Sequence, residues 1–439
     1  MTAGRRESIC LGGTASRNSA PPHRKPLSAG ESRITAAPHA INPKHLRAFL
    51  AVAQTGSVVR SSGMVRRVQS AVTRSIQELE RELGALLFER RPQGMLLTGL
   101  GRTLLHRVER AFAEMESARQ GIAAAGPPTG WNEHAPILSL SLGRQRLLAF
   151  AELVEQRHMG AVADSLLISQ PAVSQALREV ELGLGIEVFI RSPAGLQPTP
   201  LGALLALHVR RALAEIRAAE VEIGLLQGAM AGRVTVGTLS LGRTRLLPQA
   251  IIRMQKDHPN LTVSTTEGSF EHLSMRLRAG DIDFILGALR SPEHTIGLTR
   301  ETIAQDELAI VTRAGHRLAG NADTDFAALA NARWVLPQRG TPTRELLEAA
   351  LAGRGLSAPQ VAVETTDLAI TRGLLLDSDL LTAVSPHLFQ PEIDGGRLVI
   401  LPLDLPETRR GVGLLQRAGG SPSLAARLLM NSVRAIGRL

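Results

Sequence analysis

Tyrosine is absent from this 439-residue chain, cysteine occurs once and tryptophan twice. So few aromatic side chains argue against stacking on the bases of single-stranded nucleic acid. Because Cys10 is alone in a Gly/Ser-rich segment, one chain holds no disulfide and no cysteine-based metal site. No apolar run is long enough to span a membrane, and the segment after Arg5 and Arg6 is too short and polar for a signal peptide. We therefore expect a cytoplasmic protein.

The formal net charge of +10 is unevenly spread along the chain. Residues 1–43 carry 6 basic and 2 acidic side chains, and residues 44–120 carry 13 and 7. Residues 145–230, by contrast, carry 7 basic and 9 acidic side chains. The basic excess near the N-terminus favours attraction to phosphate groups. Residues 1–43 are also rich in Pro, Ser, Gly and Ala, which predicts a disordered tail, with an over-extended gene start as the alternative.

A long internal repeat is present. Residues 46–118 match residues 147–219 at a fixed offset of 101 without a gap, and 24 of the 73 positions are identical. Self-similarity of this kind indicates a duplicated structural unit. We expect the first module over 44–120 and the second over 144–230, joined by a Pro/Gly-rich linker over 121–143.

The second copy has a well-marked helix start. Ser169 is a good N-cap, Pro171 suits the first helical turn, and Gly185 ends the helix. The helical period turns Val173, Leu177 and neighbouring apolar residues inward and leaves polar residues outward. A helix that presents Gln and Ser from its first turns suits readout of the DNA major groove. The outward residues are Gln170, Pro171, Ser174, Gln175 and Arg178.

The first copy departs from this pattern. Val68 stands where the second copy has Ser169, which removes a cap worth about 0.5–2 kcal/mol unless Gln69 or Ser70 replaces it. This copy is richer in cations, at Arg60, Arg66, Arg67, Arg74, Arg90 and Arg91. We therefore predict that the second copy reads bases and the first binds phosphates. The reverse assignment, and a copy kept only as a scaffold, are the alternatives.

The run Ser-Gln-Pro-Ala-Val-Ser from Ser169, followed by Glu, Leu-Gly, Phe-x-Arg and Thr-x-x-Gly, resembles the winged helix-turn-helix of LysR-type transcriptional regulators. The resemblance implies double-stranded promoter DNA as a partner, assembly as a homodimer or homotetramer, and RNA polymerase as a further partner. The DNA-binding residues that we predict are Arg66, Arg67, Gln69, Ser70, Thr73, Arg74, Arg90, Ser169, Gln170, Pro171, Ser174, Gln175, Arg178 and Arg191.

A heptad pattern follows the second module. Its apolar positions alternate in steps of four and three, which is typical of a two-helix association. The first copy keeps most of this pattern, from Leu104 to Ile122. With the family resemblance, the pattern predicts a helix that pairs between subunits through Leu205, Val209, Ala212, Ile216, Ala219, Ile223 and Leu226. Ordinary core packing is the alternative.

From residue 231 onward, short apolar runs alternate with amphipathic segments, which indicates α/β units. This part resembles the effector domain of the same family, similar to periplasmic solute-binding folds with two α/β lobes. The fold class that we expect is thus two tandem α winged helix-turn-helix copies and a two-lobed α/β domain over 231–439.

The same resemblance predicts a ligand cleft between the two lobes. It places there Thr238, Ser240, Thr244, Gly268, Ser269, Gln338, Thr341, Thr365 and Thr366, although each Ser or Thr has a helix cap as its alternative role. The galactose-binding-protein regulator subgroup is the most similar one, which implies a sugar or sugar acid as effector.

The predicted function is therefore ligand-responsive transcription regulation, without cofactor, metal or catalytic residues. A solute-binding receptor is the first alternative, but it leaves the Ser169–Ser174 motif unexplained. An enzyme is the second, but the sequence has no nucleophile elbow, no His-x-x-His spacing and no phosphate-binding Gly loop.

Overall fold

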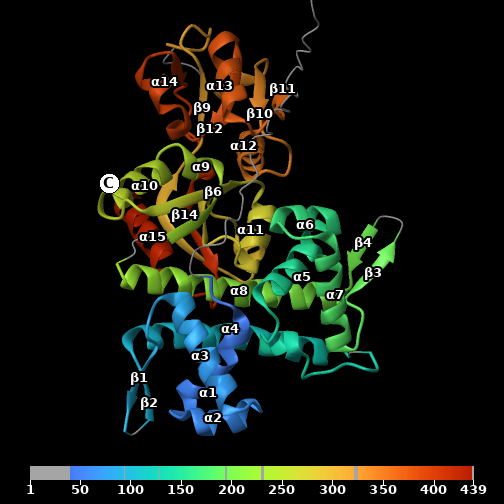
Figure 1. Ribbon diagram of the computed structural model, residues 1–439. Helices are drawn as coiled ribbons and strands as arrows, with labels where there is room; N and C mark the ends of the chain where they lie inside the picture. Colours follow the sequence, from blue (N-terminus) through green and yellow to red (C-terminus); the bar gives the residue numbers. More distant parts are fainter. Residues whose placement is uncertain are drawn as a thin grey trace, which may run out of the picture. The chain divides into compact units, whose positions relative to one another are not determined.

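A computed structural model describes residues 40–437, except residues 93, 127, 193–194, 229–231 and 321–324 (Figure 1). Most of the expected disordered tail, including Cys10, lies outside the described residues. The last residues assigned to the tail are structured, which corrects that boundary. Ile41 is buried, and its N–H donates a hydrogen bond to Glu220 at 2.8 Å. Pro43–His45 then forms a short 3-10 helix that leads into the first module.

The first module contains three helices, a two-stranded wing and a long trailing helix. Ser57 caps the second helix by accepting a hydrogen bond from the N–H of Arg60 at 3.4 Å, and Thr98 caps the long helix. The elements are α1 (Leu46–Thr55), α2 (Val58–Val65), α3 (Gln69–Leu83), β1 (Phe88–Arg91), β2 (Gly94–Leu97) and α4 (Gly99–Ala124).

The second module repeats this order of elements. Ser169 caps its third helix as predicted, accepting from the N–H of Ala172 at 3.3 Å, and Gly185 ends that helix in the left-handed conformation. In the first module no side chain caps α3 at Val68, as the sequence also predicted. The elements are α5 (Arg144–Gln156), α6 (Met159–Leu166), α7 (Gln170–Leu184), β3 (Phe189–Ser192), β4 (Gly195–Pro198) and α8 (Pro200–Leu226).

Residues identical in both copies make the same contacts. The Glu80 carboxylate accepts from the N–H of Leu87 at 2.8 Å, and that of Glu181 accepts from Val188 at 3.1 Å. A Cβ on Gly101 would lie 2.1 Å from a carbonyl oxygen of the segment before the wing, and Gly202 meets the same restriction. Glutamate and glycine are therefore required to join helix, wing and trailing helix.

The segment predicted as a linker, 121–143, is more structured than its composition suggests. Helix α4 extends to Ala124, and a 3-10 helix forms over Pro136–Ser139. Ile137 and Leu140 are fully buried in the core that the two modules share. The linker prediction was therefore wrong for the ends of this segment, because its few apolar residues find a hydrophobic surface on α4 and α7.

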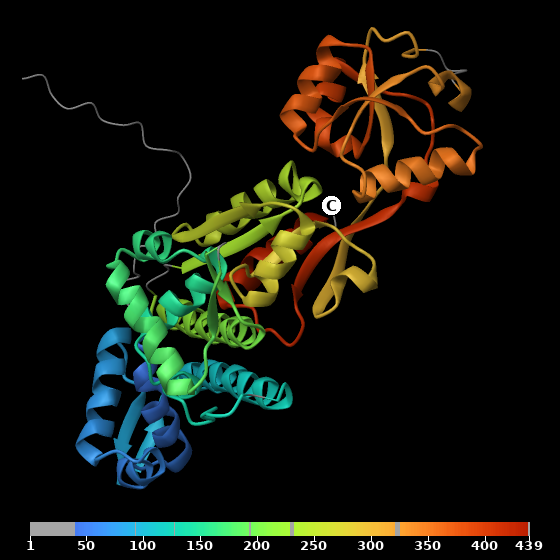
Figure 2. The same cartoon turned by 90° about the vertical axis from the view of Figure 1, so that its right-hand side faces the viewer.

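The predicted helix-pairing seam exists, but its partner lies in the same chain. Helices α4 and α8 pack along each other, and Figure 2 shows them as neighbours. They run antiparallel, because Arg107 near the start of α4 contacts Glu222 near the end of α8, and Gly121 lies against Leu204.

This pairing corrects the predicted pairing between subunits. Six of the seven seam residues of α8 are at most 1% exposed, and they are covered within one chain; the six are Leu205, Val209, Ala212, Ile216, Ala219 and Ile223. The seventh, Leu226, is 57% exposed and lies outside the seam. A heptad pattern indicates that a helix packs against another helix, but it does not indicate whether that partner helix belongs to the same chain.

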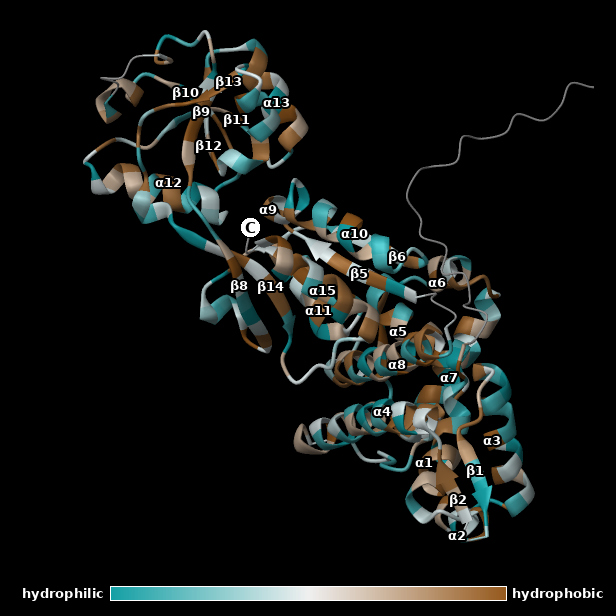
Figure 3. Cartoon of the chain, turned by 90° about the vertical axis from the view of Figure 1, so that its left-hand side faces the viewer, coloured by the Kyte–Doolittle hydropathy of each residue, from teal (hydrophilic) through white to brown (hydrophobic). Residues whose placement is uncertain are grey.

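Two five-stranded sheets form the remaining domain. Lobe I has the strand order β6-β5-β7-β14-β8. Figure 3 shows β14 beside β8, and the two strands pair antiparallel along their full length. The elements of lobe I are β5 (Gly232–Thr238), α9 (Ser240–Arg243), α10 (Leu246–Asp257), β6 (Leu261–Glu267), α11 (Phe270–Ala279), β7 (Phe284–Ala288), β8 (Leu298–Asp306), β14 (Arg410–Arg417) and α15 (Leu424–Gly437).

Lobe II has the strand order β11-β10-β12-β9-β13. The chain enters it between β8 and β9 and returns between β13 and β14, so two crossings connect the lobes. The elements of lobe II are β9 (Ala309–Arg313), β10 (Arg333–Leu336), α12 (Pro342–Gly353), β11 (Gln360–Glu364), α13 (Leu368–Asp377), β12 (Leu380–Val384), α14 (Gln390–Asp394) and β13 (Leu398–Ile400). The two-lobed α/β expectation is confirmed.

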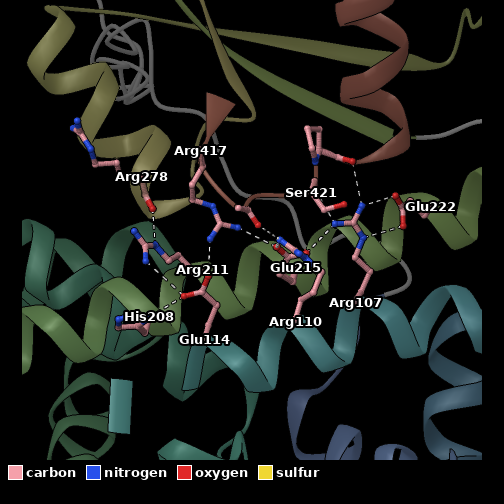
Figure 4. Close-up of polar contacts among 12 residues, drawn as sticks. Arg107, Arg110, Glu114, His208, Arg211, Glu215, Glu222, Arg278, Arg417 and Ser421 are labelled. Carbon is pink, nitrogen blue, oxygen red and sulfur yellow. Dashed lines mark hydrogen bonds and ion pairs between the residues drawn. The ribbon is translucent and has the colours of Figure 1, made fainter. Parts of the chain in front are cut away.

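A polar cluster joins the helix pair to lobe I (Figure 4). Glu114 of α4 accepts hydrogen bonds from His208 of α8 at 2.8 Å and from Arg417 of β14 at 2.6 Å. Burial raises the pKa of the Glu114 carboxyl, but the bonds from His208 and Arg417 and the charge of Arg211 outweigh burial and lower that pKa to about 2.

We therefore predict that Glu114→Gln reduces the free energy of unfolding at neutral pH. A carboxyl with a depressed pKa stabilises the fold above its unfolded value, near 4.5, and loses this contribution as the pH falls toward 2. The difference between the two proteins should accordingly shrink between pH 5 and 2. Urea denaturation across that range measures it. Glu116→Gln is the control, because Glu116 is exposed and its ion pair with Arg119 is open to solvent, so it should show at most a small difference of the same kind. A deficit independent of pH would contradict the assignment.

Candidate DNA interface and ligand cavity

The first turns of α7 present a polar surface. Its outward residues are exposed, apart from Ser174, which is half-buried, while Val173 and Leu177 pack inward. Ser169 is both exposed and engaged as the helix cap. The Gln175 side chain donates to Glu179 at 3.1 Å within the same helix. The predicted residues in this helix therefore share one solvent-facing surface; they are Ser169, Gln170, Pro171, Ser174, Gln175 and Arg178.

Helix α3 presents an equivalent surface with different residues. Gln69, Ser70 and Arg74 are exposed and Thr73 is half-buried. The turn before it places Arg66 in the left-handed conformation, with φ of 51°, at the end of α2. Arg67 follows and is exposed as well. Two guanidinium groups thus flank the start of α3, where the second module has Leu167 and Ile168.

The wings add one arginine each. Arg90 in β1 pairs in register with Met95, and Arg191 in β3 pairs with Leu196. Both arginines are exposed. Among the described residues, no ion pair involves the cations predicted to bind DNA, which are Arg66, Arg67, Arg74, Arg90, Arg178 and Arg191. Cations without carboxylate partners remain available to phosphate groups.

The predicted effector residues lie at the carboxyl ends of strands, but they do not form one set. Thr238 is 1% exposed, and its hydroxyl points to the Thr266 carbonyl of the neighbouring strand at 3.5 Å. Ser269 caps α11 by accepting from the N–H of His272 at 3.2 Å. For Ser269 the structure therefore supports the helix-cap alternative, and for Thr238 it supports a role inside the sheet.

The remaining predicted residues are more accessible. Thr341 precedes α12, and its hydroxyl donates to the Gln338 carbonyl at 2.7 Å. The Thr365 hydroxyl accepts from the N–H of Asp367 at 3.1 Å, next to the exposed Thr366. Ser240 is half-buried at the start of α9, and Gly268 is exposed after β6. These residues lie near the ends of strands but do not come together in one binding site.

A cavity of about 620 Å³ lies between α10 of lobe I and the α13–α14 region of lobe II. Thr244 is the one predicted effector residue that lines it. Its cations, Arg245 and Arg372, and its imidazole, His387, were not predicted from the sequence. Arg372 is paired with Glu392 at 2.6 Å, whereas Arg245 is exposed. These residues come from segments more than 120 positions apart in the chain, so no local motif could have marked them.

In the part of the chain that the structure describes, no group of three or more His, Cys, Asp or Glu residues is arranged to hold a metal ion. Within the same residues, no helix has the length and apolar character that crossing a membrane requires.

Comparison with protein families finds matches over both helix-turn-helix modules and over the two lobes. The bacterial regulatory helix-turn-helix model of the lysR family matches twice, over residues 43–102 and 145–203. The LysR substrate binding domain model matches residues 227–437. The duplication read from the sequence is therefore a duplication of a recognised DNA-binding module.

Comparison with individual proteins leads to the same family. The HTH-type transcriptional regulator GalR of Pseudomonas putida is 43% identical over 396 residues, covering 90% of this chain and 97% of that protein. This alignment is too long to leave out either helix-turn-helix module. The regulator GbpR of Azospirillum brasilense is 30% identical over 278 residues, covering 63% of this chain and 79% of its own.

Among solved structures, a full-length OxyR variant from Pseudomonas aeruginosa has a similar fold. It has a TM-score of 0.50 and 21% identity, and covers 67% of this chain and 96% of that one. The relatives are named as transcriptional regulators rather than enzymes. With both family models matched and a 43% identical relative aligned over nearly its full length, this chain belongs to the LysR family of bacterial transcriptional regulators.

Proposed function

We propose that both helix-turn-helix modules of this chain contact promoter DNA, and that a small molecule bound between the effector lobes changes this binding. The observation that carries the proposal is the pair of exposed polar surfaces at the starts of α3 and α7. Each offers Gln, hydroxyl and Arg side chains from the first turns of a helix, where major-groove contacts are made.

The two modules differ in what they contribute to DNA binding. Module two supplies most of the base readout, because its capped helix holds Gln170 and Ser174 in place. Module one adds most of the phosphate attraction to base contacts of its own, because Arg66 and Arg67, at the start of α3, are in no ion pair among the described residues. Phosphate contacts fix position and affinity, whereas base contacts fix sequence preference.

The effector is a small polar molecule with an anionic group, such as a sugar acid. Arg245 and His387 line the cavity, and Gln249 and Thr244 add hydrogen-bonding groups. The Arg372 charge is already matched by Glu392, so Arg245 is the cation that remains for a ligand. A neutral sugar would leave that cation without a counter-charge.

Regulators of this family bind promoter DNA and small effectors and are oligomeric. We propose that this chain also forms a homodimer or homotetramer, through surfaces other than the α4–α8 seam. RNA polymerase is the proposed further partner. Because bacterial promoters lie in the cytoplasm, this function also implies a cytoplasmic protein.

We predict that Gln170→Ala with Ser174→Ala lowers the preference for operator over random DNA by about 1–3 kcal/mol per lost base contact. Arg66→Ala with Arg67→Ala should instead weaken binding to all DNA and flatten its salt dependence, because fewer counterions are released. Salt titrations on operator and random duplexes measure both effects. If only the Arg66/Arg67 variant loses sequence preference, the first module is the reader. If one variant changes neither, that module is a scaffold.

We predict that Ser240→Ala weakens the response to the effector while DNA binding without effector stays at the wild-type level. Ser240 begins α9, the short helix that leads directly to Thr244 and Arg245 of the cavity. Its half-buried side chain makes no hydrogen bond among the described residues, so its loss should leave the fold intact. Gel shifts with and without effector measure the response. Equal loss of both activities would show that Ser240 is structural.

We predict that Arg245→Met lowers the affinity for an aldonic acid by roughly 10- to 100-fold, as expected for a lost hydrogen bond to a charged group. The affinity for the corresponding neutral hexose should stay as weak as in the wild type. Calorimetric titration of both compounds measures this, with Arg253→Met in α10, the helix that follows Arg245, as the control. Tighter binding of the hexose by the wild type would contradict an anionic effector.

A further inference from the structure

Helices α4 and α8 are related by an internal two-fold axis. At the offset of 101 residues, Arg107 corresponds to His208, and Glu114 corresponds to Glu215. Arg107 contacts Glu215 at 2.8 Å, and the corresponding pair, His208 and Glu114, is also 2.8 Å apart. These two contacts are therefore counterparts in which the two helices exchange roles.

A second pair of contacts follows the same rule. Arg110 contacts Glu215 at 3.1 Å, and its counterpart Arg211 contacts Glu114 at 3.7 Å. An interface in which residue i meets j while j meets i is the signature of two-fold symmetry between identical subunits. Here it relates two halves of one chain.

This helix pair has no room for another chain at its seam. The apolar positions of α4 are at most 1% exposed, as are those of α8; they are Leu104, Val108, Ala111, Met115, Ala118 and Ile122. Lobe I covers part of the polar side of the pair as well. Arg107 donates to the carbonyls of Ser421 and Pro422, and Arg110 donates to that of Gly419 (Figure 4).

Each long helix carries its own DNA-reading head at its start. Thr98 caps α4 and Thr199 caps α8, each accepting from a glycine N–H, at 2.9 and 3.0 Å. Because the joints match, we infer that the two heads follow the same exchange of roles as the two helices. A two-fold axis suits inverted half-sites, since a DNA duplex has the same symmetry in its backbone.

Resting on the DNA-binding function proposed above, we propose that a single chain reads an operator of two inverted half-sites of unlike sequence, with no second chain supplying a head. The half-sites differ because the readers differ. Arg74 stands in α3 where α7 has Gln175, and Ser70 stands where α7 has Pro171. A dimer of chains then carries four heads arranged as two such pairs.

The first test asks which chain completes the helix pair. A Cβ on Gly121 would lie 2.9 Å from a Leu204 methyl carbon, so Gly121→Cys with Leu204→Cys places two thiols in reach of each other. Cys10→Ser removes the native thiol. After oxidation, the two thiols should be closed to alkylation until a reductant is added, while a non-reducing gel shows the mass of one chain, 46.9 kDa.

The control pair is Glu109→Cys with Leu204→Cys, since Glu109 lies twelve residues, or about 18 Å, from Gly121 along the helix. It should give no link. A link at the mass of two chains in the Gly121/Leu204 variant would overturn the proposal.

If circular dichroism shows that the Gly121/Leu204 variant fails to fold, Glu114→Cys with Arg211→Cys, joined by a short bismaleimide, replaces it. A link at the mass of one chain then supports the proposal, and a link at the mass of two chains opposes it.

The second test uses random double-stranded DNA as the probe. Selection with the wild-type chain should recover two inverted half-sites of unlike sequence. Gln69→Ala with Thr73→Ala should weaken binding at one half-site, and Gln170→Ala with Ser174→Ala at the other, each by roughly 10- to 100-fold. Recovery of one half-site, of direct repeats or of a perfect palindrome would overturn the proposal.

Mixing the two head variants completes the test. If both heads come from one chain, an equimolar mixture protects no more of the operator than either variant alone. Full protection by the mixture would show that heads pair between chains. Failure to select any DNA would refute the DNA-binding function, whereas the cross-link result would still report on the pairing within the chain.

Discussion

The arrangement of this protein depends on a buried ion cluster around Arg107. Its side chain is 1% exposed and contacts Glu215 at 2.8 Å and Glu222 at 2.6 Å. Removing one partner from such a cluster is strongly destabilising, because it leaves a charge without compensation away from water. The same cluster binds the carbonyls after β14, so it fixes α4, α8 and lobe I together.

Strand β14 connects that cluster to the boundary between the lobes. At its start, Arg410 contacts Asp306 at 3.1 Å and Thr343 of α12 at 3.0 Å. At its end, Arg417 contacts Glu114 and Glu215 of the helix pair. Seven residue steps of extended chain span about 23 Å. A change in how the lobes meet therefore acts on one end of an element whose other end contacts the DNA-binding half.

Much of the fold could be predicted from local sequence. Ser169 and Gly185 marked the ends of α7 because capping uses residues next to the helix. The seven-residue apolar pattern marked the seam of α8. Its partner could not be identified, since the same pattern serves a helix from the same chain or from another. That α4 is the partner of α8 depends on Arg107 meeting Glu215 and Glu222, and one buried arginine leaves no pattern in the sequence.

The residues that line the ligand cavity were harder still to predict from local sequence. The predicted residues follow strand ends, which a motif can place, and Thr244 does line the cavity. Arg245, Arg372 and His387 meet only because two lobes approach each other, and nothing in their neighbouring residues marks them. Ser269 had two possible roles, and the hydrogen bond it accepts from His272 assigns it to the helix cap.

The pairing of α4 with α8 also changes how this protein depends on its own abundance. Subunits that must meet in solution separate when they are scarce, but a short tether keeps two segments at a high effective concentration at any dilution. Two heads joined by residues 125–143 stay paired even in a cell that holds a few copies. The seam is covered within one chain, so it presents no apolar surface to similar helices of related regulators.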